Sequence, residues 1–170
     1  ALSCTFNFLT SLDVSANTAL TSLSCSYNEL TSLDVSANTA LTYLDCYNNQ
    51  LIHLNMKNGV TDQLTEFNAT NNSLTCIEVN SEDVAWATEN WTSANGNIDE
   101  GVSFAICCGL EDVSQWYVAT TGSDTDCGNS EEIPFATIQL GIGSSDNGDT
   151  VSVAAGIYVE LINFNGKDIA

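Results

Sequence analysis

The stretch "LTSLDVSANTALTSLSCSYNE" at residues 9–29 is followed at once by a near copy, "LTSLDVSANTALTYLDCYNNQ", at residues 30–50. A period of 21 residues indicates stacked coils, because one short coil cannot bury its own apolar side chains whereas neighbouring coils can. The two blocks therefore predict a solenoid.

Each coil contains two short segments in which apolar and polar residues alternate, and we predict a strand at each. The first has the form LxCxxN and begins at Leu2, Leu23 and Leu44, with Phe67 in its place in a fourth, longer coil. The second has the form LxVxxN and begins at Leu12 and Leu33, and it continues without the asparagine at Leu54 and Ile77. Alternation sends two side chains of each segment into the core and one outward. The asparagine stands at the turn, where its amide can bond backbone groups that the bend leaves unpaired.

Three of the seven cysteines, Cys4, Cys25 and Cys46, follow the repeat. Such residues could be reactive thiols or ligands, but Ala69 takes the same place in the fourth coil. We therefore interpret them as small buried hydrophobic residues that remain thiols.

The pattern resembles the leucine-rich repeat family, "LxxLxLxxNxL", and specifically the short 21-residue type found in large secreted bacterial surface proteins. The resemblance covers residues 1–80. It implies a right-handed solenoid with a parallel sheet on one face, and a role in adhesion or protein recognition.

The outward positions of the predicted strands are small and polar. They are Ser3, Ser24, Asp45 and Asn68 in the first series, which we take as the candidate binding residues, and Asp13, Asp34, Asn55 and Glu78 in the second. Phe6 and Tyr27 share a register position, but no longer aromatic stripe is expected. A solvated sheet face is therefore favoured over a platform of rings that would stack on sugars.

Residues 81–110 are predicted to form a cap, which covers the open end of the last coil. Apolar residues from Val84 to Trp91 have helical spacing, with Ser81 or Asp83 as the N-cap, and "GVSFAICCG" reads as a strand. The stretch resembles the C-terminal cap of the bacterial repeat domains.

The resemblance to that cap implies a disulfide between Cys76 and Cys108, which leaves Cys107 and Cys127 for a second. The alternative, Cys76 with Cys107 and Cys108 with Cys127, stays open, because sequence does not determine connectivity. Any such disulfide implies an oxidising compartment.

The sequence pattern of residues 111–170 differs from that of the repeats and the cap. "PFATIQ" reads as a short helix, and "GDTVSVAAGIYVELINFNGKDI" predicts two or three strands. The segment resembles the start of a right-handed parallel β-helix of the pectate-lyase-like class, with an end-plugging helix and about one coil. That resemblance implies an incomplete β-helix without catalytic residues, since those of such lyases and hydrolases lie on later coils.

The chain has 22 acidic and 2 basic residues and a net charge of −20, which disfavours nucleic acid and anionic membranes. The single histidine makes a zinc site unexpected. Four carboxylates lie close together in the sequence and are weak calcium candidates: Asp124, Asp126, Glu131 and Glu132. They lack the spacing of a calcium-binding loop, so a solvated loop is favoured and no cofactor is predicted.

The fold class predicted is thus a mainly β solenoid: repeat coils, a small α/β cap and a truncated parallel β-helix. There is no apolar run of 18 residues and no evident signal peptide, and the chain starts inside a repeat, as a mature form or a fragment would. We predict a non-catalytic extracellular module, secreted or at the cell surface, that recognises a protein or polysaccharide. The alternative is an accessory part of a secreted polysaccharide-degrading β-helix enzyme. The exposed end of an incomplete β-helix would also favour end-to-end self-association.

Overall fold

The protein was analysed as a computed structural model, which describes residues 1–109 and 113–170. The chain divides into two compact units, Ala1–Cys108 and Gly109–Ala170, called here the N-terminal and C-terminal units. Each is described by itself. The predicted boundary between cap and β-helix, at residues 110 and 111, lies outside the described residues.

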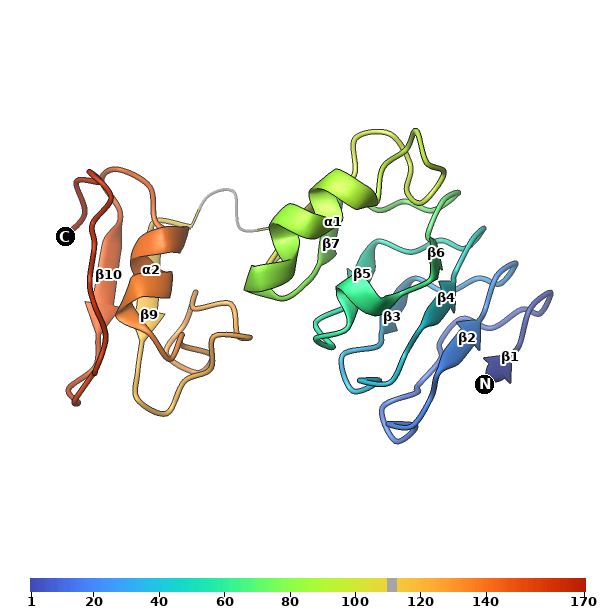
Figure 1. Ribbon diagram of the computed structural model, residues 1–170, viewed down its shortest axis with the longest axis horizontal. Coiled ribbons are helices and arrows are strands. Elements are labelled where there is room, and N and C mark those ends of the chain that lie inside the picture. Colours follow the sequence, from blue (N-terminus) through green and yellow to red (C-terminus); the bar gives the residue numbers. More distant parts are fainter. Residues whose placement is uncertain (110–112) are drawn as a thin grey trace. The chain divides into compact units, whose positions relative to one another are not determined.

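The N-terminal unit contains two parallel sheets (Figure 1). Sheet 1 is built from the first segment of each coil, in the order β1 (Leu2–Ser3), β2 (Ser22–Ser24), β4 (Tyr43–Asp45) and β6 (Glu66–Asn68). Sheet 2 is built from the second segments and ends in the cap, in the order β3 (Ser32–Asp34), β5 (His53–Asn55), β7 (Cys76–Glu78) and β8 (Ser103–Ala105). The resemblance implied one sheet. There are two because the half-repeats also pair with each other, Leu33 with Leu54 and Asn55 with Glu78.

Strand pairing confirms the 21-residue register. Leu2 is opposite Leu23, Leu23 is opposite Leu44, and Leu44 is opposite Phe67. The extra length of the coil that leads to Phe67 contains a short 3-10 helix, η1 (Thr61–Gln63). The insertion therefore leaves the strand register intact.

The stacked coils bury a continuous apolar core. Leu23, Leu44 and Ile77 are fully buried, and so are Cys25 and Cys46. The cysteines thus fill the core position that Ala69 fills in the fourth coil, as predicted. Cys4, in the first coil, is half-buried.

Asparagines satisfy the backbone at the turns between coils. The side-chain nitrogen of Asn28 donates to the carbonyl oxygens of Cys4 (3.0 Å) and Cys25 (2.9 Å), and its oxygen accepts from the N–H of Leu9 (3.0 Å). Asn49 and Asn72 repeat the arrangement one and two coils later. Each asparagine therefore links two neighbouring coils through groups that would otherwise be buried without a partner.

Residues of the predicted cap form two helices and a strand after β7. These are η2 (Ser81–Asp83), α1 (Val84–Asn90) and β8, which pairs with β7. Trp91 packs on Phe67 and Phe104, with ring centroids 4.3 and 5.8 Å apart, and belongs to the repeat core. A disulfide joins Cys76 on β7 to Cys108, so the cap is covalently attached to the last coil. Asp83 precedes α1, but its side chain makes no capping hydrogen bond.

The C-terminal unit has a parallel pair, β9 (Gln115–Val118) and β10 (Thr150–Val153), beside α2 (Ile138–Ser144). Among the described residues after Gly148, β10 is the one strand, where two or three were predicted. The final residues still run alongside it, since the N–H of Ala170 donates to Asp149 (3.0 Å) and the N–H of Val151 donates to Ala170 (2.8 Å).

The helix begins later than "PFATIQ" predicted. Phe135 is fully buried and its backbone pairs with that of Val118, so it cannot join a helix. The Thr137 hydroxyl accepts from the N–H of Leu140 (3.3 Å) and caps α2. The Glu160 carboxylate then accepts from the N–H groups of Ile138 (2.9 Å) and Gln139 (2.8 Å), which favours a helix start at Ile138.

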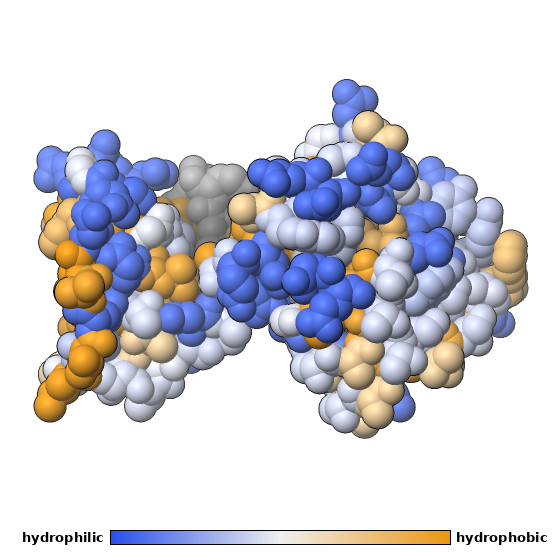
Figure 2. All heavy atoms as spheres, viewed as in Figure 1, coloured by the Kyte–Doolittle hydropathy of each residue, from blue (hydrophilic) through white to orange (hydrophobic). Residues whose placement is uncertain are grey.

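Beyond β10, alternate residues of an extended segment point outward. Figure 2 shows hydrophobic residues on the surface of this unit, and Ile157, Val159 and Leu161 are almost fully exposed. In the described parts of the chain, no helix has the length and apolar character needed to cross a membrane.

Candidate functional site

The sequence-predicted binding residues Ser3, Ser24, Asp45 and Asn68 lie in register on the outer face of sheet 1. Much of their hydrogen-bonding capacity is used locally. Ser24 donates to Asp45 (3.2 Å), and Asp45 accepts from the N–H of Tyr47 (3.1 Å). The side-chain oxygen of Asn68 accepts from both the N–H and the hydroxyl of Thr70 (3.0 and 2.7 Å). These side chains therefore stabilise turns at the strand ends.

Sheet 2 carries a groove on its outer face, with a volume of about 390 Å³. Its polar lining is Ser32, Asp34, His53, Asn55 and Glu78, and the Cys76–Cys108 disulfide forms part of its wall. A second hollow of about 330 Å³ includes Asp13 and shares Ser32 and Asp34 with the first. The two hollows together extend the groove along the sheet, across successive coils.

Asp34 and Asn55 keep polar atoms available to a ligand in this groove. One oxygen of Asp34 accepts from the N–H of Ser36 (2.8 Å), and the other is 3.4 Å from the side-chain nitrogen of Asn55. Such a long contact is a weak hydrogen bond that a ligand could replace. His53 and Ser32 are opposite each other on neighbouring strands and are exposed.

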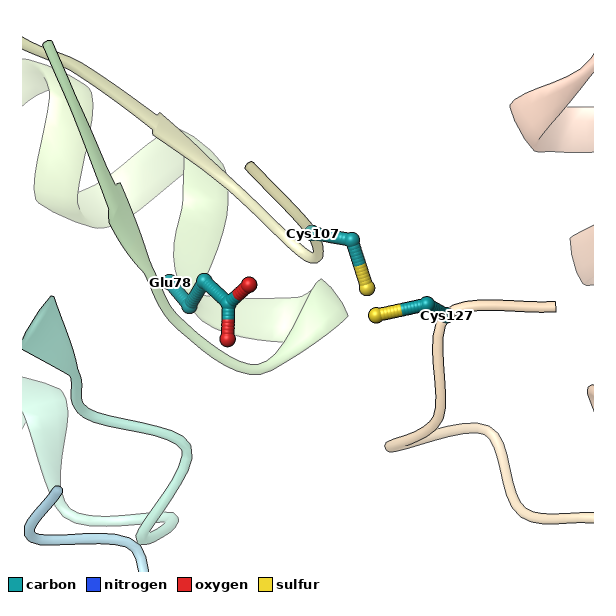
Figure 3. A group of neighbouring side chains, drawn as sticks. All are labelled: Glu78, Cys107 and Cys127. Atoms are coloured by element: carbon teal, nitrogen blue, oxygen red, sulfur yellow. The ribbon is translucent and has the colours of Figure 1, made fainter. Parts of the chain in front are cut away.

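Glu78, which lines the groove, forms an ion pair with Lys57. The Lys57 ammonium is 3.7 Å from the Glu78 carboxylate and is 3.5 Å from the sulfur of Cys107, and Glu78 also accepts from the N–H of Cys108 (3.2 Å). Figure 3 draws Glu78 on β7 and Cys107 just after β8. Cys107 and Cys127 are both disulfide-bonded, so their sulfurs are not thiolates and cannot serve as soft metal ligands. The contacts with Lys57 and with the N–H of Cys108 fix the position of Glu78.

The calcium candidates do not come together. Asp124 accepts from the N–H groups of Ala136 and Thr137 (both 2.9 Å) and from the hydroxyl of Thr137 (3.0 Å). In the segments that the structure describes, the ligand atoms of Asp126, Glu131 and Glu132 do not join those of Asp124 in a cluster able to hold one ion. Asp124 instead orders the loop that leads into α2.

The repeat cysteines Cys4, Cys25 and Cys46 are free thiols. Burial raises the pKa of Cys25 to about 12 and holds the pKa of Cys46 well above its ordinary value. Because the thiolate is the reactive form, neither cysteine is a nucleophile at neutral pH.

We expect iodoacetamide at pH 8 to leave Cys25 and Cys46 unmodified in the native protein. Their raised pKa values and complete burial remove both the thiolate and the access that alkylation needs. Peptide mass spectrometry measures the modification, and the same reaction in concentrated urea, where all three thiols should react, is the control. Rapid native labelling of Cys25 would contradict the buried-core interpretation.

Sequence reasoning missed an aromatic strip at the turns that follow sheet 1. Phe6 stacks on Tyr27, with ring centroids 4.2 Å apart and planes 10° apart, and Tyr27 meets Tyr47 edge-on at 5.2 Å. The stack does not continue in register, because Asn48 takes the position of Tyr27 in the next coil. Tyr47 is 20 residues after Tyr27 instead of 21, so counting by register excluded it.

The paired strands and their register make the N-terminal unit a solenoid of mostly parallel strands with few helices. The comparison with protein families found no match, and neither did the comparison with curated proteins. One solved structure, described as the functional domain of InlJ from Listeria monocytogenes that includes a cysteine ladder, is 47% identical in sequence. The match covers 46% of this chain and 17% of that chain, with a TM-score of 0.43.

Proposed function

We propose that this chain is an extracellular recognition module that binds a partner on the outer face of its repeat solenoid, without catalysis of its own. The observation that carries the proposal is the groove on sheet 2, where Asp34, His53 and Asn55 are presented in register by three-residue parallel strands. These side chains are not part of the apolar core. Such a rigid scaffold presents polar side chains that the packing of the fold does not require. This arrangement is suited to recognition.

Charge narrows the class of partner. With a net charge of −20, the chain repels anionic polysaccharides and nucleic acids at long range. The Asp13 and Asp34 carboxylates along the groove add to this locally. The partner is therefore an extracellular protein or polysaccharide whose contacting surface is neutral or cationic.

The disulfide supports a location outside the cytosol. The Cys76–Cys108 disulfide attaches the cap, and such structural disulfides persist in oxidising compartments. We accordingly place the protein at the cell surface or in the secreted fraction.

Ser32→Trp should weaken partner binding at least about tenfold, because the indole would fill a groove that three strands line. Binding of beads coated with the full chain can be measured on a panel of cultured cells, extracellular proteins and neutral polysaccharides. Gln50→Trp is the matched control, because it adds an equally exposed indole outside the groove. Equal binding by both variants would contradict a role for the groove.

The parallel pairing of β9, β10 and the backbone of Ala170 favours a second candidate, an accessory part of a polysaccharide-degrading β-helix enzyme. The same panel separates the two candidates. Binding confined to a polysaccharide and unaffected by Ser32→Trp would favour the accessory role. End-to-end association through the apolar residues 157, 159 and 161 likewise stays a proposal.

A further inference from the structure

The aromatic strip, defined as Phe6, Tyr27 and Tyr47, is a surface that the repeat core does not use. Phe6 is 74% exposed and Tyr27 is 39% exposed, and no ring of the strip belongs to the hydrophobic core of the N-terminal unit. Phe6 stacks on Tyr27, and both rings keep exposed surface.

The backbone beneath two of these rings is strained. Phe6 and Tyr27 both have a φ of 55°, in the left-handed region that bulky residues rarely adopt. The same register position in the next two coils holds Asn48 and Asn71, with φ values of 54° and 60°. Asparagine adopts this conformation at little cost, because its short amide can bond the local backbone.

An aromatic side chain at this position therefore destabilises the fold relative to asparagine. Packing in the core does not offset this loss, because the rings lie outside the core. Strain of this kind is commonly retained at sites of function. The strip is also ordered beyond its stacking. The side-chain nitrogen of Asn71 approaches the Tyr47 hydroxyl (3.4 Å) and donates to Asn48 (3.1 Å), and a hydrogen bond with Tyr47 raises the pKa of Tyr27.

We propose that the aromatic strip is a second binding surface, separate from the groove, that takes an arginine-bearing segment of a protein partner. A planar guanidinium stacks against the exposed rings of the strip, since aromatic faces attract cations and arginine stacks better than lysine. Long-range attraction to a chain of net charge −20 brings such a segment to the surface. Asp45, whose carboxylate accepts from the N–H of Tyr47, places a negative charge beside the rings.

The test compares binding of hexa-arginine and hexa-lysine peptides to the full chain by calorimetry at about 0.15 M salt, where weak surface attraction is screened. The wild type should bind hexa-arginine at least about fivefold more tightly than hexa-lysine, because only the guanidinium stacks well. The double variant Phe6→Asn with Tyr27→Asn should lose this preference. The net charge is unchanged in the variant, so any nonspecific attraction of polycations remains.

Two controls make the outcome decisive. Phe8→Asn removes an exposed ring that is not in the stack, and it should keep the preference for arginine. The double variant should unfold at the same urea concentration as the wild type or a higher one, because asparagine relieves the strained backbone. An arginine preference that survives in the double variant would overturn the proposal. A clear loss of stability in the double variant would also overturn the proposal, because it would show that the rings stabilise the fold. Binding of neutral cellohexaose that the double variant loses would assign the strip to carbohydrate instead.

Discussion

Leu44→Ala is expected to lower the free energy of unfolding of the N-terminal unit by about 3–5 kcal/mol. Leu44 is fully buried and lies opposite Leu23 on one side and Phe67 on the other. Truncation would leave a cavity between coils that cannot close, because the strands on both sides hold the spacing of the coils. Urea unfolding followed by tryptophan fluorescence measures the effect, since Trp91 packs on Phe67.

The matched control is Leu161→Ala, the same chemical change at a side chain that is 95% exposed. It should change the free energy of unfolding by less than about 0.5 kcal/mol. A loss below about 1 kcal/mol for Leu44→Ala would be too small for a core position and would show that the strand register is wrong.

Removal of the cap disulfide by Cys76→Ser with Cys108→Ser should cost about 3–4 kcal/mol, from the loop-closure entropy of its 32-residue separation. The disulfide joins β7 to the chain just after β8, and β8 is the edge strand of sheet 2 that pairs with β7. Without it, the cap should open before the repeats unfold, because in a solenoid a terminal element contacts a neighbour on one side only. Hydrogen exchange should then show lost protection at residues 103–105 and retained protection at residues 43–45.

Cys25→Ala is the control for loss of a cysteine without loss of a disulfide. Ala69 fills the equivalent core position in the fourth coil, so this change should cost only about 1 kcal/mol. Equal losses for Cys25→Ala and the double serine variant would contradict a stabilising role for the disulfide. The pairing of Cys107 with Cys127 stays a prediction, which peptide mapping of the unreduced protein can test.

The sequence by itself determined the repeat and its core. Leucine, cysteine and asparagine recur every 21 residues, and stacking places equal positions of successive coils in equal surroundings. The period therefore assigns a role to each of Leu23, Cys25 and Asn28, and it implies that the last coil needs a cap.

Only the tertiary structure decided where that regularity breaks. Whether the half-repeats pair into a second sheet depends on contacts between coils, and Tyr47 reaches the aromatic strip from one residue outside the register. The start of α2 depends on Glu160, which is 22 residues further along the chain from Ile138. A periodic pattern carries local information that every coil repeats, whereas the positions of Tyr47 and Glu160 depend on single long-range contacts that leave no period in the sequence.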